Sequence, residues 1–483
     1  MVLVVIVAVQ LMFGIDATVM TVALPSAGRD LGLDLVGQSW VQSGYVVAFG
    51  ALLLLGARLG DVLGRRRMVL VGVALFTVTS LIGGLAGNGP MLIALRAAQG
   101  AGAALAGPNT MALLMLAFAA GPARNRALAI FSAVLGAGGT LGLVLGGLLT
   151  FGAGWRVVLL INVPVGLVLL LLAPRFLPET GRTSGALDLP GIAASGIGIA
   201  ALVLGLTNAV EYGWATVPAI TPLAVAVVLL ATFVRVERRA ANPVLPMTLL
   251  LDRSRGTGYL AAALASGAMF GTFFLLTQFL QVVLRLGPLP AGLALVPLMG
   301  SMLATIRLVP RLLARVRASA VVVAGATVFL SGAAWLTTLD ARSAYLTGIL
   351  GPLVLLGVGG GLTFVPLSSS ILGAVPQALA GSASGALQAV QYSGTAFGVA
   401  VLVALVSAAR RGGADFGAAI GDAVVGALVL EALVLALAAG RLRWDRPVAP
   451  TKLLDNARLS PTAGPRPADS DPVADAPSTT ADS

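Results

Sequence analysis

The chain has 483 residues, of which 58% are hydrophobic and only 10% are charged. A soluble domain normally carries about 25% charged residues, and the mean hydropathy here is +0.99. These values exclude a soluble globular protein and indicate a protein surrounded by lipid. The sequence contains no Cys and no His, which excludes disulfides, thiolate catalysis and nearly all zinc or haem ligation. We therefore expect no metal and no cofactor, and any proton chemistry must use carboxylates.

Apolar stretches of about 20 residues, long enough to cross a ~30 Å hydrocarbon core, recur along most of the chain. The first stretch carries Asp16 and lacks a basic start, so we interpret it as a span and not as a cleavable signal peptide. The fold class predicted is an all-α polytopic membrane protein with about fourteen transmembrane helices. In chain order the spans are expected near 2–24, 40–59, 68–87, 91–117, 127–150, 156–173, 189–208, 218–234, 258–280, 291–309, 319–338, 346–370, 383–408 and 422–440.

The formal net charge of +11 raises the question of nucleic-acid binding. The arginines do not gather on one face, however, but lie between apolar stretches, in clusters at 65–67, 235–239 and 311–317. The positive-inside rule places such clusters in cytoplasmic loops. We therefore expect no nucleic-acid partner, and we predict a multi-pass protein of the bacterial inner membrane with both termini in the cytoplasm.

Two segments differ in composition from the spans. The longest internal polar connection runs from Arg235 to Arg255 and contains Pro243 and Pro246, as a linker between separately moving parts would. The last segment, 441–483, is rich in Pro, Ala, Asp, Ser and Thr. It has too few large apolar residues to bury a core, so we predict a disordered cytoplasmic tail.

Asp16 and Arg96 are two of the charged residues that lie inside predicted spans. Asp16 lies in the first span, where an ionised carboxylate costs several kcal/mol unless it is protonated, paired or hydrated. We predict that it takes part in proton coupling by taking up and releasing protons; a plain helix–helix hydrogen bond is the alternative. Arg96 lies in the fourth span, one helical turn before Gln99. Since it keeps its charge, it needs a partner, such as a carboxylate on a neighbouring helix, unless it reaches the outer surface of the membrane.

Glu431 lies near the middle of the last span with no charged neighbour within a helical turn. It is a second candidate for proton coupling. A peripheral helix is a poor place for a proton carrier, so a structural or oligomer contact is the alternative.

Glycines mark three places where helices can approach closely or turn tightly. The loop between the second and third predicted spans reads Gly56-Ala57-Arg58-Leu59-Gly60-Asp61-Val62-Leu63-Gly64-Arg65. Its residue pattern is more ordered than a basic loop at the membrane surface requires, and Asp61 can attract the positive end of a helix. We predict a conformational latch formed by Gly56, Asp61, Gly64 and Arg65. Helix packing or gating is predicted for Gln99, Gly100, Gly102, Gly142, Gly146 and Gly147, although ordinary packing explains these glycines equally well.

Several motifs together resemble the major facilitator superfamily, in its fourteen-span branch of drug:proton antiporters. The resemblance covers about residues 10–440 and rests on the segments 16–25, 56–67, 96–104, 155–156, 162–166, 187–191 and 287–297. It implies two six-helix bundles, at 1–175 and 258–440, with two inserted helices and a linker at 176–257, before the tail at 441–483. It further implies a monomer that expels a small, lipophilic drug or antibiotic in exchange for protons by alternating access, with the proton gradient as its energy source.

The family resemblance also implies a substrate cavity between the bundles, and polar residues on the spans expected to line it are Tyr45, Asn109, Gln278, Gln388 and Gln391. In the fifth span the family's signature has a proline where this chain has Leu143. This departure favours the alternative of uptake or uniport on the same fold. A membrane-embedded enzyme is a remote alternative, because the acids predicted in outer loops are scattered.

Overall fold

The computed structural model describes residues 1–118, 122–179, 189–213, 215–237, 253–313, 315–339, 343–373, 375 and 380–440. All of these belong to one compact unit, Met1–Arg446. The predicted tail and most of the predicted linker lie outside the described residues. The predicted domain boundaries therefore stay predictions.

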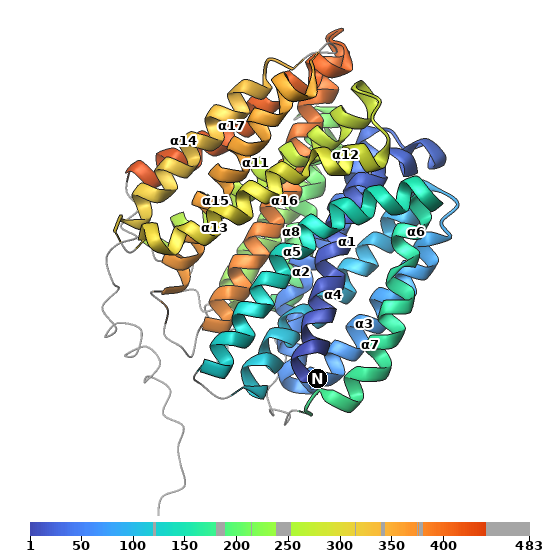
Figure 1. Ribbon diagram of the computed structural model, residues 1–483, viewed down its shortest axis with the longest axis vertical. Helices are drawn as coiled ribbons and strands as arrows, with labels where there is room; N and C mark the ends of the chain where they lie inside the picture. Colours follow the sequence, from blue (N-terminus) through green and yellow to red (C-terminus); the bar gives the residue numbers. More distant parts are fainter. Residues whose placement is uncertain are drawn as a thin grey trace, which may run out of the picture. The chain divides into compact units, whose positions relative to one another are not determined.

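The described residues are helical almost throughout (Figure 1). The first helices are α1 (Val2–Leu31), α2 (Leu35–Leu63), α3 (Arg65–Gly84), α4 (Gly89–Ala117), α5 (Pro122–Ala153), α6 (Trp155–Leu160) and α7 (Asn162–Phe176). They are followed by α8 (Leu189–Tyr212) and α9 (Val217–Glu237). The last are α11 (Arg253–Gln278), η1 (Phe279–Val283), α12 (Pro288–Ala294), α13 (Val296–Leu313), α14 (Ala318–Leu336), η2 (Tyr345–Ile349), α15 (Leu350–Gly373), α16 (Ala380–Arg411) and α17 (Phe416–Gly440).

Local sequence explains several helix ends. The side chains of Asp34 and Asn88 accept hydrogen bonds from the third residue beyond them and so cap α2 and α4. Gly32 ends α1 in the left-handed conformation, with φ of 66°. Gly154, with φ of 86°, separates α5 from α6, where a residue with a Cβ would be strained.

Every one of the fourteen predicted spans coincides with a helix or a pair of consecutive helices. Within the described residues, eleven helical segments are long and apolar enough to cross a membrane, or twelve when the bent α2 is one span. The two others, α5 and α8, contain shorter apolar parts, Leu141–Ala153 and Ala193–Gly205. The all-α polytopic class is therefore confirmed, whereas the number fourteen stays a prediction.

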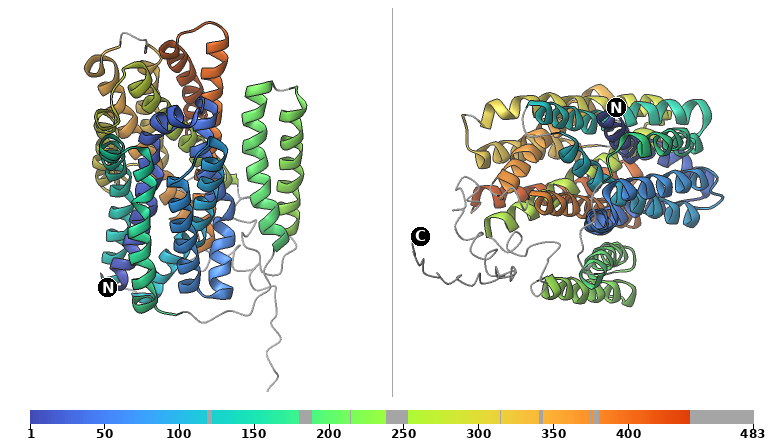
Figure 2. Two further views of the ribbon diagram at one scale, coloured as in Figure 1. Left: turned by 90° about the vertical axis from the view of Figure 1, so that its right-hand side faces the viewer. Right: turned by 90° about the horizontal axis from the view of Figure 1, so that it is seen from below.

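The helices pack in two groups and one hairpin. In the first group, α4 packs on α2 and α3, α5 packs on α1, and α7 packs on α3. In the second group, α11 packs on α16, α15 packs on α13 and α14, and α17 contacts α11, α14 and α16. The hairpin of α8 and α9, green in Figure 2, contacts α2 and α16 through α8. The main contacts between the two groups are those of α2 with α16 and of α5 with α12.

Successive long helices run in opposite directions, so the bundle has two ends. We name them the Val2 end and the Leu31 end, after the first and last residues of α1 (Figure 1). Among the described residues, two side-chain hydrogen bonds that join the groups lie toward the Leu31 end. Gln278 Nε2 donates to Gln38 Oε1 at 2.7 Å, and Gln281 Nε2 donates to the carbonyl of Val22 at 2.7 Å.

Candidate functional site

The centre of the site is an ion pair buried in the first group of helices. Arg96 of α4 donates from Nη1 to Asp16 Oδ2 of α1 at 2.6 Å, and both side chains are 0% exposed. The alternative that Arg96 reaches the membrane surface therefore does not hold in this structure. Removing two charges from water is unfavourable, so such a pair persists only when further hydrogen bonds satisfy its remaining atoms.

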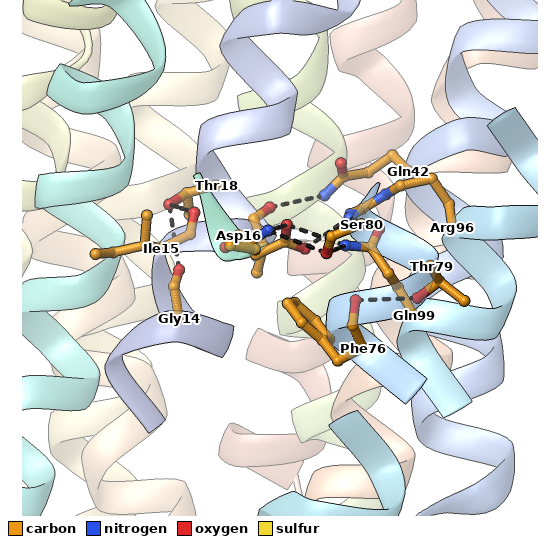
Figure 3. A network of polar contacts seen from close by, with 12 residues as sticks. Gly14, Ile15, Asp16, Thr18, Gln42, Phe76, Thr79, Ser80, Arg96 and Gln99 are labelled. Atoms are coloured by element: carbon orange, nitrogen blue, oxygen red, sulfur yellow. Dashed lines mark hydrogen bonds and ion pairs between the residues drawn. The ribbon is translucent and has the colours of Figure 1, made fainter. Parts of the chain in front are cut away.

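Two neutral side chains, Gln99 and Asn162, bond to the pair, and Ser80 bonds to both of them (Figure 3). Arg96 Nη1 also donates to Gln99 Oε1 at 2.9 Å, and Gln99 Nε2 donates to Ser80 Oγ at 2.6 Å. Asn162 Nδ2 donates to Asp16 Oδ1 at 2.8 Å and lies 3.4 Å from Ser80 Oγ. Both oxygens of the carboxylate thus accept a hydrogen bond. We call these five residues the Asp16 network.

Helix geometry brings the network together from four helices. Arg96 and Gln99 are three residues apart and therefore share one face of α4. Asn162 begins α7 directly after the break between α6 and α7, which turns its amide toward α1. Close approach of the helices depends on Gly102, because a Cβ there would lie 2.8 Å from backbone atoms of Gly72 and Phe76. Gly100 fits against the backbone of Tyr45 in the same way.

The guanidinium of Arg96 has a second neighbour besides the carboxylate. Its central carbon lies 4.5 Å from the centre of the Tyr45 ring, which belongs to α2. The Nε and Nη2 atoms of Arg96 are buried and find no hydrogen-bond acceptor among the described residues. Tyr45, which the sequence placed among the cavity residues, is itself only 2% exposed.

The predicted latch residues lie near the Val2 end, about the junction of α2 and α3. Asp61 Oδ1 accepts a hydrogen bond from Arg65 Nη2 at 2.8 Å, and both side chains are partly exposed. Gly64 has φ of 102°, which makes the turn between the helices possible. A Cβ on Gly56 would overlap the α4 backbone at Ala104, so α2 and α4 touch here. Whether these residues act as a latch stays a prediction.

The glycines of α5 face two different helices. Cβ atoms on Gly142 and Gly146 would each lie 2.7 Å from carbonyl oxygens of α1, those of Ile15 and Val19. A Cβ on Gly147 would lie 2.8 Å from the carbonyl of Pro288, the first residue of α12. The helix α5 therefore lies between the helix that carries Asp16 and the second group.

The other predicted site residues lie apart from the Asp16 network. Asn109 is buried and donates to the carbonyls of Gly56 and Leu105, so it ties α4 to α2. Gln278 bonds to Gln38 as described above, Gln388 is exposed and Gln391 is half-buried. Their role as cavity residues stays a prediction.

Glu431 is 1% exposed and lies on α17, which packs within the second group. It therefore belongs to the half of the molecule that does not contain Asp16. Its predicted part in proton coupling has no link to the Asp16 network in this structure, and it stays a prediction.

The sequence did not assign Ser80 or Asn162 to the site. Asn162 carries two recognisable signals: it begins the family motif at 162–166, and it is an amide inside an otherwise apolar span. Ser80 carries none, because a serine in a membrane helix commonly bonds to its own preceding turn. A second polar cluster, at the Leu31 end, was also not predicted. There Asp30 Oδ2 accepts hydrogen bonds from Trp155 Nε1 at 3.0 Å and from Arg156 Nη1 at 2.5 Å.

Comparison with known proteins places the chain among transporters. The family model described as Major Facilitator Superfamily matches residues 6–399. The cephamycin export protein CmcT of Amycolatopsis lactamdurans is 42% identical over 428 residues, 87% of this chain and 88% of that protein. The puromycin resistance protein pur8 of Streptomyces alboniger is 39% identical, over 83% of this chain and 80% of that protein.

A third relative and a solved structure agree with this placement. The lincomycin resistance protein of Streptomyces lincolnensis is 34% identical, over 89% of this chain and 90% of that protein. The inward-open structure of the xylose transporter XylE from E. coli has a TM-score of 0.61 and 14% identity, over 95% of this chain and 98% of that one. At this low identity the structural likeness shows the fold alone.

Proposed function

Since the chain belongs to the Major Facilitator Superfamily, we propose that it exports a small organic compound of the antibiotic type in exchange for protons. Two observations support the proposal. The relatives over most of the chain include proteins named for cephamycin export and for puromycin and lincomycin resistance. Within the molecule, the observation that supports the proposal most strongly is the fully buried ion pair of Asp16 and Arg96. Helix packing alone does not require a buried carboxylate that depends on a buried arginine for its countercharge.

Protonation of Asp16 is the step that we propose links protons to movement. While Asp16 is ionised, Arg96 and Asn162 hold it in place. A proton on the carboxylate removes the countercharge of Arg96, and an unpaired buried charge is strongly unfavourable. The guanidinium must then find another partner or another position. A change in protonation therefore favours a change in helix packing, as a proton-driven transporter requires.

The orientation and the membrane belong to the same proposal. The arginine clusters support an orientation in a bacterial inner membrane in which the Val2 end faces the cytoplasm. The bonds of Gln278 and Gln281 at the Leu31 end then hold the external side of the two groups together. In this arrangement Asp16 would exchange its proton with the cytoplasm. We propose that these bonds then open and that Asp16 is protonated from the outside. A lipophilic substrate leaves on that side, and the protein acts as a monomer.

Uptake of a solute on the same fold is the second candidate. It is favoured by Leu143, which replaces the proline of the antiporter signature and lies within the uninterrupted helix α5. The direction of substrate movement under an imposed proton gradient separates the two candidates.

The test uses inverted membrane vesicles from a bacterial host that lacks its own efflux pumps. Their interior is acidified, and entry of puromycin, lincomycin and a cephamycin is measured separately. Our proposal predicts accumulation of at least one compound, which stops when the gradient is dissipated by an uncoupler. Expulsion of substrate from preloaded vesicles under the same gradient would instead support uptake in the cell. Vesicles without the protein are the control.

A further inference from the structure

The contacts of Arg96 single out Tyr45 of α2. The Nε and Nη2 atoms of Arg96 have no acceptor among the described residues, and the central carbon of its guanidinium lies over the Tyr45 ring. A guanidinium over an aromatic face is attracted by the ring electrons, and this attraction grows when water is excluded. Both side chains are buried here. Arg96 therefore has two countergroups, of which only the Asp16 carboxylate can be neutralised by a proton.

Three aromatic rings lead from this arginine to the second group of helices. The Tyr45 and Phe49 rings of α2 are stacked, with centroids 6.3 Å apart and an interplanar angle of 19°. Phe49 meets Tyr392 of α16 at 4.4 Å with the rings tilted by 54°. A Cβ on Gly50 would lie 3.2 Å from the Tyr392 Cβ, so the two helices lie close together at this depth. We call Tyr45, Phe49 and Tyr392 the aromatic series.

The aromatic series crosses the main contact between the two groups, that of α2 with α16. Packed rings transmit displacement because interiors are dense and have few alternative arrangements. A shift of the Arg96 guanidinium relative to Tyr45 must therefore be accommodated by Phe49 and then by Tyr392. Among the described residues, this is the only series of aromatic ring contacts that leads from the buried ion pair to the second group.

We propose that Tyr45 is a positioning residue that holds the Arg96 guanidinium when Asp16 is protonated, and that Phe49 and Tyr392 pass its displacement to α16. The proposal rests on the proposed function of Asp16. The protonation state of one carboxylate in the first group is then converted into a change at the contact between the two groups. The Tyr45 ring is the essential feature, and its hydroxyl is dispensable.

The groups that face the ion pair are consistent with a single titrating site. From α1 comes Asp16 itself and from α2 the phenol Tyr45, while the phenol Tyr392 of α16 lies one ring further away, against Phe49. The helices α3 and α7 contribute Ser80 and Asn162, which do not titrate. Because phenols ordinarily lose their proton only near pH 10, the pH response proposed here is assigned to the carboxylate.

The test needs a reporter for the contact between the groups. Since the natural chain contains no cysteine, the double variant Gln38→Cys/Gln278→Cys carries the only two thiols. Its reaction with a short cleavable bifunctional thiol reagent measures how often the Leu31 end is closed. The full-length protein is studied in proteoliposomes from acidic to alkaline pH. Tyr45→Leu, Tyr45→Phe, Tyr392→Leu and Tyr392→Phe are added to this reporter.

We expect the pH dependence of cross-linking to be lost in Tyr45→Leu and Tyr392→Leu and retained in both phenylalanine variants. Retention of the full pH dependence in the leucine variants would overturn the proposal. So would equal loss in Tyr45→Phe, because the hydroxyl and not the ring would then be responsible. If Tyr45→Leu does not fold, the more accessible Tyr392 pair decides the question by the same criteria.

Asp16→Asn in the same reporter separates this proposal from the proposed function. Cross-linking that no longer depends on pH in Asp16→Asn supports Asp16 as the titrating site, whatever the tyrosine variants show. Cross-linking that stays dependent on pH in Asp16→Asn contradicts the proposed function. If cross-linking keeps its pH dependence in Tyr45→Leu but loses it in Asp16→Asn, the role of the aromatic series is contradicted and the proposed function is not.

Discussion

Asp16 and Arg96 each make the burial of the other possible. The carboxylate accepts from Arg96 on one oxygen and from Asn162 on the other. Neither charge has water to replace a lost partner, since both side chains are 0% exposed. Removing one member of such a pair leaves the other as an unpaired buried charge, which is more destabilising than removing both. The coupling between the two charges is therefore measured by comparing single with double substitutions.

The first prediction concerns the stability of the pair. Arg96→Gln leaves the Asp16 carboxylate buried without its countercharge and should lower the free energy of unfolding by about 3–5 kcal/mol. Asp16→Asn/Arg96→Gln removes both charges and should recover most of this loss. Thermal unfolding in detergent micelles measures the difference. Lowering the pH should lessen the loss in Arg96→Gln, because a proton neutralises the stranded carboxyl. An equal loss in the single and double variants would show that the pair is not coupled.

The second prediction concerns Asn162, whose amide donates to the ionised carboxylate at 2.8 Å. A donor to the charged form favours that form, so Asn162→Ala should favour the protonated form of Asp16. The pH profile of transport should therefore move to higher pH. Asn208→Ala is the matched control, because the Asn208 amide bonds to the Pro218 carbonyl in the α8–α9 hairpin. An unmoved profile in Asn162→Ala would remove Asn162 from the proton-coupling account.

Sequence reasoning found the charged members of the site and Gln99, but not Ser80 or Asn162. Charges are rare inside apolar spans, so Asp16 and Arg96 are conspicuous, and the need of Arg96 for a carboxylate follows from its fixed charge. Ser80 and Asn162 are uncharged, and many such residues in helices bond only to their own backbone. Which of them meets Asp16 depends on the rotation and depth of neighbouring helices. Those quantities are set by packing across the bundle and leave no mark in the local sequence.

At the scale of the element, α5 links the Asp16 helix to the second group. One stretch of α5 presents Gly142 and Gly146 to α1, and the next residue, Gly147, faces α12. Small residues at such contacts let backbones approach closely, which is the main source of helix association in lipid. A side chain at these positions would move α1 and therefore Asp16.

The third prediction tests this contact with two substitutions in one helix. Gly146→Val places methyl groups against the Val19 carbonyl of α1 and should cost about 1–3 kcal/mol by overpacking. We expect loss of transport with reduced thermal stability in detergent. Gly152→Val is the control, because nothing lies within 4 Å of a Cβ at that position. Comparable damage from both variants would mean that β-branching in α5, and not contact with α1, is responsible.

Element positions were the most predictable feature of the fold. Hydropathy and charge placed fourteen ranges that all fall on observed helices, because lipid requires every span to satisfy its own backbone. The motifs likewise gave the family, which is confirmed. The interior of α2 was not predictable in the same way. Its two parts, Leu35–Leu53 and Leu55–Leu63, meet at 48°, and a bend of that kind depends on the neighbours of the helix.

At the scale of the whole molecule, the two groups are joined at the Leu31 end by the side chains of Gln38, Gln278 and Gln281. Such neutral hydrogen bonds are individually weak, each contributing about 0.5–1.5 kcal/mol. They can therefore hold one arrangement without making it permanent. A transporter that works by alternating access has to break them once in every cycle.

The fourth prediction follows from that requirement. Cross-linking of Gln38→Cys/Gln278→Cys should stop transport, because the Leu31 end can no longer open, and cleavage of the cross-link should restore it. Each single-cysteine variant treated with the same reagent is the control. Transport that continues in the cross-linked protein would show that the contact of Gln38 with Gln278 persists throughout the cycle.

Proton coupling through Asp16 is the central claim, and movement of protons tests it most directly. The purified protein is reconstituted in proteoliposomes that contain a pH-sensitive dye, and a transported antibiotic is added without a proton gradient. The account predicts a substrate-induced pH change for the natural chain and for Asp415→Asn, which alters an exposed acid that caps α17. It predicts no such change for Asp16→Asn. A pH change of unaltered size in folded Asp16→Asn protein would contradict the account.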